Sequence, residues 1–360
     1  MNTKRRSKIS VFVVFATLIA ALCVACGDGD NGSRRRLVSY TAVDTPVQST
    51  TADVVRKIAD TVVEIKTNTV ITQWGMQYVV SGAGSGVIVA HDEAFETYYI
   101  VTNNHVIDGA NEIKVTLHSG EMYTAALVAT DARDDIAVVS IKETSTLNVA
   151  IWGNSDSLQI GEDLIAIGNP LGSLGGTVTK GILSATKRFI PVGDYTMELL
   201  QTDTAINPGN SGGGLFNMRG NLIGIVNAKT TDEEVEGICF AIPSNTAKAI
   251  FEDLVENGVV IGRATIGVEV AYGSNGTVYV KNVIDAESGT FEQYDKIAEI
   301  NGNAITSLLT YNDAIGAIKP DDEVKVKVYR GQLVQNKYGS GISFSSEPTE
   351  FTVTAKQLAK

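Results

Sequence analysis

The sequence is 360 residues long, with 44% hydrophobic and 19% charged residues, which excludes a disordered chain and leaves room for two folded domains. The formal net charge of −12 argues against nucleic acid as a partner, because contacts to phosphates need a basic surface. The histidines are scattered, and two of the three cysteines, Cys23 and Cys26, lie at the end of an N-terminal apolar segment, so we expect no disulfide framework, no metal and no organic cofactor.

The N-terminus has the pattern of a targeting segment. Lys4, Arg5, Arg6 and Lys8 precede an apolar run from Ile9 to Ala25, as in a secretory signal or a membrane anchor. The run ends in Cys23-Val24-Ala25-Cys26, which resembles a bacterial lipoprotein processing site with Cys26 as the lipidated residue, although Cys23 stands where a leucine is usual. An uncleaved anchor is the alternative. Both interpretations place residues 27–360 outside the cytoplasm, with residues 27–50 as a flexible tether.

From Ala52 onward the sequence predicts a mainly β domain. Val54 to Val63 is apolar at helical spacing, and short strand-like runs separated by Gly, Asn and Asp then recur without intervening helices. These runs are Gln77–Val80, Gly86–Val89, Tyr98–Val101, Ile113–Leu117, Ile136–Ile141, Asp163–Ile167, Thr177–Ser184 and Leu222–Val226. Such a series is typical of a sandwich or a pair of barrels, and we expect residues 51–257 to form this domain.

An amphipathic helix over Asn245–Asn257, closed by Gly258, marks the domain boundary. The remaining residues, 258–360, predict a small α+β unit with a helix over Leu308–Ile318. Its expected strands are Ile266–Val270, Val278–Val280, Lys296–Ile300 and Val324–Tyr329.

Three short motifs carry possible chemistry. Ser211 lies in the glycine-rich stretch Asn207–Gly214, where a tight turn can bring backbone N–H groups together into an anion hole. His105 follows a predicted strand, and Asp135 directly precedes another. Each motif also has an ordinary structural explanation: a hairpin turn, a structural histidine and a solvated acidic turn. Together, in the order His, Asp, Ser, they match one known order of a catalytic triad.

These residues resemble the HtrA/Deg family of extracytoplasmic serine proteases. The matching segments are Ser85–Ile88, Thr102–Ile107, Asp135–Val138, Ala166–Gly172, Gly181–Ser184, Leu200–Gly213 and Phe240–Pro243. The resemblance implies a chymotrypsin-like domain of two six-stranded β-barrels followed by a PDZ-like domain. It also implies a homotrimer.

The same resemblance assigns roles to single residues. Ser211 would be the nucleophile, His105 its general base and Asp135 the carboxylate that orients His105, with Asp134 and Asp108 as rival acids. The N–H groups of Gly209 and Ser211 would form the oxyanion hole.

The resemblance also places the pocket for the substrate side chain beside Ala205, which lies six residues before Ser211, and beside Ile225, Val226 and Asn227. Because Ala205 carries no charge, we expect cleavage after small or medium aliphatic residues.

The C-terminal unit resembles a PDZ domain in Arg263–Val268, Ile297–Gly302 and Val326–Gly331. The resemblance places the loop that binds a peptide C-terminus at Thr265, Ile266, Gly267 and Val268. The match is weaker at Phe291–Asp295, and Gln332–Pro348 is longer than usual, so a purely structural role for this unit stays open. The remaining cysteine, Cys239, is expected to be a small buried hydrophobe.

The sequence therefore predicts a serine endopeptidase that hydrolyses misfolded or damaged extracytoplasmic proteins through an acyl-enzyme. The expected partners are unfolded proteins at the protease domain, peptide C-termini at the PDZ-like domain and a bacterial membrane at the N-terminus. The alternative is a chaperone-like or regulatory peptide-binding protein with a latent protease site.

Overall fold

A computed structural model describes residues 37–41, 50–73, 76–168, 176–207, 209–227, 237–273, 276–285, 290–336 and 339–358. The N-terminal apolar run with Cys26, most of the expected tether, and Asn169–Gly172 of the matching segments lie outside these residues. Among the described helices, none is both long enough and apolar enough to cross a membrane.

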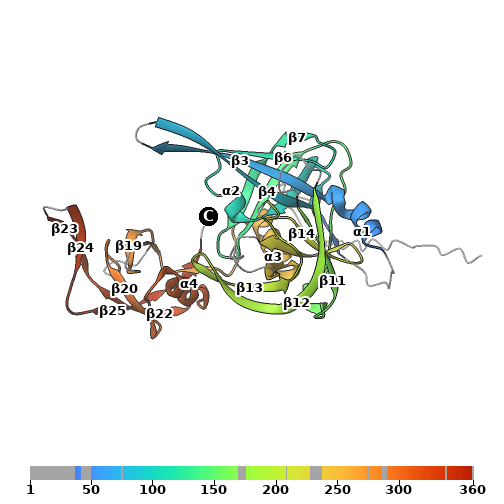
Figure 1. The fold of residues 1–360 in the computed structure, drawn as a ribbon. Helices are drawn as coiled ribbons and strands as arrows, with labels where there is room; N and C mark the ends of the chain where they lie inside the picture. The colour runs from blue at the N-terminus through green and yellow to red at the C-terminus, as the bar shows by residue number, and fades with distance from the viewer. Residues whose placement is uncertain are drawn as a thin grey trace, which may run out of the picture. The chain divides into compact units, whose positions relative to one another are not determined.

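The first sheet is built from the N-terminal half of the protease region (Figure 1). Its order is β7-β6-β3-β4-β5-β9-β8, with β1 paired to β4. The strands are β1 (Leu37–Val38), β3 (Val62–Gln73), β4 (Met76–Asp92), β5 (Thr97–Thr102), β6 (Glu112–Thr116), β7 (Met122–Thr124), β8 (Ala126–Asp131) and β9 (Ile136–Lys142).

The second sheet has the order β14-β11-β12-β13-β16-β15-β10-β2, and an added β14–β15 pairing closes its main strands into a barrel. The strands are β2 (Tyr40–Thr41), β10 (Ile151–Trp152), β11 (Asp163–Gly168), β12 (Thr177–Val192), β13 (Tyr195–Thr202), β14 (Gly214–Asn217), β15 (Asn221–Asn227) and β16 (Cys239–Pro243). Each sheet thus has six longer strands, as expected, together with two strands of two or three residues.

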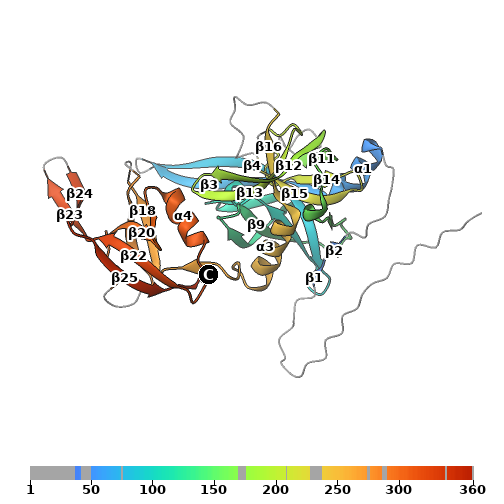
Figure 2. The same ribbon diagram turned by 90° about the horizontal axis from the view of Figure 1, so that it is seen from below.

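Three apolar clusters hold this region together. Alternate residues of one strand face different clusters: Val87 and Val89 of β4 pack in the cluster shared by both sheets, whereas Ile88 packs inside the first sheet. A third cluster, which includes Leu164 and Leu200, fills the second sheet. Helix α3 (Ser244–Glu256) packs against β8, β9 and β15 (Figure 2), so that its Phe251 side chain joins the shared cluster. Burial on both faces explains why these strands read as continuous apolar runs.

Three further helices are described in the chain. Helix α1 (Thr51–Ile58) begins at a capping box, in which the Thr50 hydroxyl accepts from Asp53 N and the Asp53 carboxylate accepts from Thr50. Helix α2 (Asn104–Ile107) follows β5, and α4 (Leu308–Gly316) lies in the C-terminal unit. Short 3-10 turns occupy Ala59–Thr61 and Ser155–Ser157.

The C-terminal unit has its own apolar cluster, which runs from Ala264 to Ala355. Its main sheet has the order β18-β19-β20-β22-β25, and β22 alternates buried Val324, Val326 and Val328 with more exposed neighbours. The strands are β17 (Ala264–Thr265), β18 (Val268–Tyr272), β19 (Val278–Val283), β20 (Lys296–Ile300), β21 (Asn303–Ala304), β22 (Glu323–Tyr329), β23 (Gly331–Asn336), β24 (Gly339–Phe344), β25 (Thr349–Thr354) and β26 (Lys356–Gln357).

Candidate active site

Asp135 and His105 form the centre of the candidate site. The Asp135 carboxylate, with the side chain only 7% exposed, accepts hydrogen bonds from His105 N at 2.8 Å, His105 Nδ1 at 2.6 Å and Asn227 Nδ2 at 2.9 Å. Because an ionised carboxylate can only accept, Nδ1 of His105 is the donor in this contact, and in the neutral imidazole Nε2 is then left as an acceptor. This is the arrangement that a general-base histidine requires.

The local backbone explains how these two side chains meet. Asp135 sits in the turn between β8 and β9 with a left-handed φ of +52°, a conformation in which aspartate is one of the tolerated residues. The carbonyl of Asp135 accepts from Asn104 N at 3.1 Å and Asn103 Nδ2 at 3.0 Å. The turn is therefore fastened to the first residues of α2, which carries His105.

The rival acids are placed elsewhere. The carboxylate of Asp134 pairs with Arg263 Nη2, which also donates to Asp131 Oδ2 at 3.0 Å. Burial raises the pKa of Asp131 in spite of the neighbouring Arg263 charge. Asp108 is an exposed residue that ends α2. Of the three candidate acids, the geometry brings Asp135 to His105.

Ser211 lies in a compact turn that is seated on the first sheet. Asn210 N donates to Asn207 O at 3.0 Å, Gly213 N to Asn210 O at 2.9 Å, and Gly212 N to Val226 O at 2.9 Å. Across to the first sheet, Ser85 N donates to Ser211 O at 2.8 Å and Ser85 Oγ to Gly209 O at 2.7 Å. The serine is 7% exposed, and its turn meets the strand ends that lead to His105.

Gly212 shows how tight this junction is. Its φ is +80°, and an added Cβ would lie 2.2 Å from Ser85 O, 2.3 Å from Thr102 Oγ1 and 3.2 Å from Asn103 N. Only glycine allows this approach. The Ser211 turn therefore packs directly against Thr102 and Asn103, two to three residues before His105.

Gly209 and Ser211 carry unpaired backbone donors. Both residues are buried, and Gly209 has a φ of +97°. Within the described part of the chain, neither the Gly209 N–H nor the Ser211 N–H has a hydrogen-bond partner. Buried N–H groups are normally paired, so two unpaired donors in one turn are what an anion-binding turn presents.

The expected pocket residues divide into different environments. Ala205 is exposed, and its carbonyl accepts from Thr179 Oγ1 at 2.8 Å, whereas Ile225 and Val226 are fully buried in β15. Asn227, at the end of the same strand, donates to Asp135. This contact was missed in the sequence analysis, since it joins residues 92 positions apart and no local pattern signals it.

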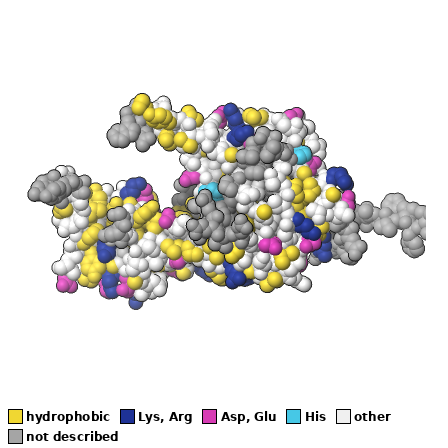
Figure 3. Space-filling view, in the orientation of Figure 1, with side chains coloured by type: hydrophobic (Ala, Val, Ile, Leu, Met, Phe, Trp, Pro, Cys, Tyr) yellow, Lys and Arg dark blue, Asp and Glu magenta, His cyan; other side chains and the backbone are white. Residues whose placement is uncertain are grey.

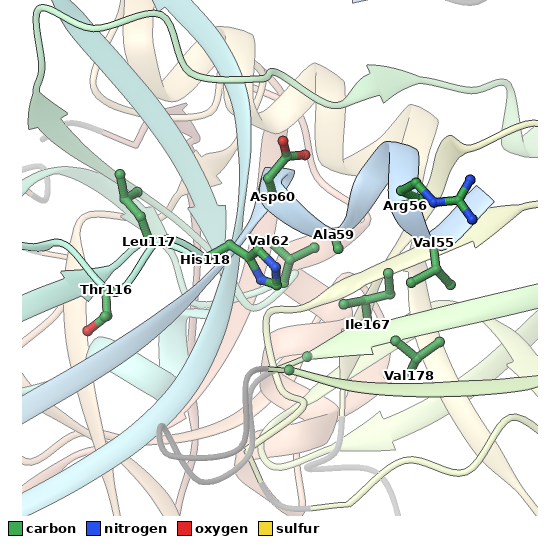
Figure 4. Close-up of a pocket in the computed structure, with 13 residues that line it drawn as sticks. Val55, Arg56, Ala59, Asp60, Val62, Thr116, Leu117, His118, Ile167 and Val178 are labelled. Carbon is green, nitrogen blue, oxygen red and sulfur yellow. The ribbon is translucent and has the colours of Figure 1, made fainter. Parts of the chain in front are cut away.

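A cavity of about 430 Å³ lies away from these residues, between α1, the turn after β6 and the strands β11 and β12 (Figure 4). Its lining includes Asp60, His118, Ile167 and Val178 but not His105, Asp135 or Ser211. The described residues contain no group of three or more His, Cys, Asp or Glu placed to hold a metal ion. Cys239 is buried in β16, and burial raises the pKa of its thiol.

The expected peptide-binding loop leads into an edge strand of the C-terminal unit. Gly267 has a φ of +78°, and its carbonyl accepts from Ile284 N at 2.9 Å and Asp285 N at 3.1 Å. Ile266 and Val268 are buried. The strand that follows, β18, pairs only with β19 among the described strands, so its other edge has no strand partner there.

The comparisons with known proteins agree with these two regions. The trypsin-like peptidase domain family matches residues 84–225, and the PDZ domain family matches residues 264–337. The serine protease Do-like HtrB of Bacillus subtilis is 40% identical over 277 residues, which cover 68% of this chain and 59% of the relative. The periplasmic serine endoprotease DegP of Escherichia coli is 36% identical over 298 residues, which cover 75% of this chain and 61% of the relative. The chain spans about three fifths of the length of these relatives.

Solved structures give the same result. The serine endoprotease from Yersinia pestis matches with a TM-score of 0.51 at 30% identity, covering 87% of this chain and 100% of that one. The HtrA-type protease AlgW with a decapeptide matches with a TM-score of 0.56 at 29% identity, and the match covers 87% of this chain and 100% of that one. The fold, the matched domains and these relatives together show that the chain belongs to the HtrA/DegP family of trypsin-like serine proteases with a PDZ domain.

Proposed function

We propose that the chain is a serine endopeptidase in which Ser211, His105 and Asp135 form the catalytic triad. The observation that carries this proposal is the seating of the Ser211 turn, with its two unpaired N–H groups, against the strand ends that hold the His105–Asp135 pair. Family membership supports it.

In the first half of the proposed reaction, Ser211 Oγ attacks the scissile carbonyl carbon while His105 Nε2 takes the serine proton. Asp135 accepts the Nδ1–H of His105 and stabilises the imidazolium that forms. The negative charge on the carbonyl oxygen is held by the N–H groups of Gly209 and Ser211. The C–N bond then breaks, and His105 gives its proton to the leaving amine.

In the second half, a water molecule attacks the acyl-enzyme. His105 takes a proton from the water and returns it to Ser211 Oγ as the acid product leaves. Asn227 keeps the Asp135 carboxylate in place during both halves through its hydrogen bond of 2.9 Å.

The proposed substrates are misfolded or damaged proteins outside the cytoplasm. Cleavage follows small or medium aliphatic residues, because Ala205 at the side-chain pocket carries no charge. Several curated relatives are named periplasmic, which supports an extracytoplasmic location. The edge of β18 would bind a peptide C-terminus as an added strand, with the Thr265–Val268 loop at its end. Cys26 would carry a lipid anchor, and the chain would assemble as a homotrimer.

The proposal is tested by incubating the chain with one protein in its folded form and in a permanently unfolded form. We expect cleavage of the unfolded form alone, and no cleavage by a Ser211→Ala variant. If the variant cleaves equally well, the proposed nucleophile is wrong. If wild type cleaves neither form but binds the unfolded one, the chain is a binding protein with a latent site.

A further inference from the structure

We propose that the open edge of β4 over residues 76–84 binds the part of an unfolded substrate that follows the cleaved bond, as an added strand. This inference rests on the proposed function and specifies the substrate class: an extended, uncharged segment that is free to pair through its backbone. The arm is defined as residues 69–73 of β3, which lie beyond the last β3–β6 pair at Asn68, together with residues 76–84 of β4 (Figure 1).

The arm carries no charged residue and several exposed apolar side chains. Between Lys66 and His91 the sequence contains no Asp, Glu, Lys or Arg. Val79 is 65% exposed, Val80 50% and Tyr78 43%, and Figure 3 shows apolar side chains along the arm. An exposed β ribbon of this kind would promote aggregation, and proteins normally protect such edges with charges. The composition therefore favours a surface that receives uncharged polypeptide.

The hydrogen-bonding groups on the arm point in known directions. Ser85 N donates to Ser211 O, and Ser85 O accepts from Thr102 Oγ1 at 2.7 Å, so both backbone groups of Ser85 point away from β3. Since backbone direction alternates along a strand, Ala83, Ser81, Val79 and Gln77 also direct N–H and C=O outward on that edge.

A second contact confirms this alternation. Val70 N, on the opposite edge of the arm, donates to Asn111 Oδ1 at 2.6 Å, which makes Val70 and Val79 a pair without mutual hydrogen bonds. The β3 edge is thus partly capped by Asn111. On the β4 edge, pairing with β5 begins only at Val87, and none of the described strands pairs with residues 76–86 on that side.

The open edge is continuous with the candidate active site. At Gly84 an added Cβ would lie 2.6 Å from Val106 Cγ1 and 3.2 Å from Ser211 O, so β4 passes between α2 and the Ser211 turn. The leaving amine must meet His105 Nε2, since His105 protonates it. The segment that follows the cleaved bond therefore leaves the site on the side of α2, where the edge of β4 begins. The backbone groups of Ser85 are already bonded, so the open outward groups run from Ala83 to Gln77. Strand spacing on substrate and edge is equal, so this edge accommodates about seven substrate residues.

The test uses the full chain and peptides with one fixed segment before the cleaved bond and Thr/Val extensions of increasing length after it. We expect kcat/KM to rise in steps of two residues to about tenfold and to level off at about seven residues, since each added backbone hydrogen bond contributes a modest net free energy. A Ser81→Pro variant, which removes one outward N–H, should lose most of this gain. The matched Ser81→Ala variant loses the same hydroxyl contact to Asn68 but keeps the N–H, and should retain the gain.

Peptide N-methylation gives the same test without a variant, because a methyl group removes one backbone N–H of the substrate. Methylation at the alternate extension positions whose N–H groups face β4 should abolish the gain in kcat/KM. Methylation at the positions between them should not. Equal rates at all lengths, or equal loss in Ser81→Pro and Ser81→Ala, would overturn the inference while leaving the protease function intact. If Ser81→Pro changed the oligomeric state but left the dependence of kcat/KM on extension length unchanged, the inference would likewise be overturned. The arm would then be assigned to a contact with a second copy of the chain. Failure to cleave even the shortest peptide would refute the proposed function itself.

Discussion

Replacing Gly212 with alanine tests the junction on which the candidate site depends. Gly212 follows Ser211, has a φ of +80° and leaves no room for a Cβ, which would lie 2.2 Å from Ser85 O and 2.3 Å from Thr102 Oγ1. Ser85 O is a backbone atom and cannot rotate away. Relief therefore requires a displacement on the order of 1 Å in the Ser211 turn or in β4.

The expected loss of stability in Gly212→Ala has two parts, a conformational cost and a packing cost, and a control variant separates them. Gly161 has a similar φ of +93°, but nothing lies within 4 Å of an added Cβ, so Gly161→Ala carries only the conformational cost of about 1–2 kcal/mol. Gly212→Ala carries this cost and an overpacking cost of about 1–3 kcal/mol. Misplacement of the nucleophile should further lower kcat/KM by about 100-fold.

Both variants are compared with wild type by denaturant unfolding and by hydrolysis of one peptide substrate. We expect Gly161→Ala to keep its activity after a small loss of stability, and Gly212→Ala to lose activity even under conditions where it is fully folded. Similar activities for the two variants would show that the Ser211 turn does not need its close contact with Ser85 and Thr102.

Three further predictions concern the surroundings of the triad and substrate choice. Asn227→Ala removes one of three hydrogen bonds to the Asp135 carboxylate, so kcat should fall about 10- to 100-fold with KM little changed; an unaltered kcat in steady-state assays would contradict this role. Burial raises the pKa of the Asp131 carboxyl above its ordinary value of 3.8. The protonated carboxyl therefore favours the folded state, and this stabilisation is fully present below pH 3.8 and is lost as the pH rises through the folded-state pKa. Asp131→Asn, which does not titrate, should therefore gain stability relative to wild type as pH rises through this range, as measured by unfolding at stepped pH; a constant difference would refute the assignment. A peptide series should be cleaved faster after small or medium aliphatic residues than after Lys or Arg, and Ala205→Asp should shift the preference toward Lys and Arg; fastest cleavage by wild type after Lys or Arg would overturn the pocket assignment.

The strands with strong apolar periodicity were predicted from the sequence. The prediction was wrong at β4, where glycines that permit close packing were interpreted as turn signals. Gln77–Val80 and Gly86–Val89 read as separate strands because Gly82, Gly84 and Gly86 lie at or between them and resemble turn signals. They are one strand, β4, of 17 residues. Gly84 and Gly86 instead permit close packing, since a Cβ at either position would lie 2.6 Å from Val106 or Ile100. Which of these functions a glycine serves depends on residues distant in sequence.

The candidate site shows the same limit. His105, Asp135 and Ser211 were named from motifs, and the structure brings His105 and Asp135 into contact and the Ser211 turn beside them. The supporting contacts of Asn227 and Arg263 could not be named, because each joins segments about 90 to 130 positions apart. Local patterns identify side chains that carry chemistry, whereas the groups that hold them in place are determined by tertiary packing.

The most direct test of the central claim is labelling of the full chain with a fluorophosphonate probe, followed by mass spectrometry of the modified peptide. This probe reacts with a serine that an adjacent base activates, so it reports the nucleophile and its environment together. We predict a single adduct on Ser211 that is lost in a His105→Ala variant although the variant still folds. An adduct on another serine, or equal labelling of Ser211 without His105, would contradict the proposed triad.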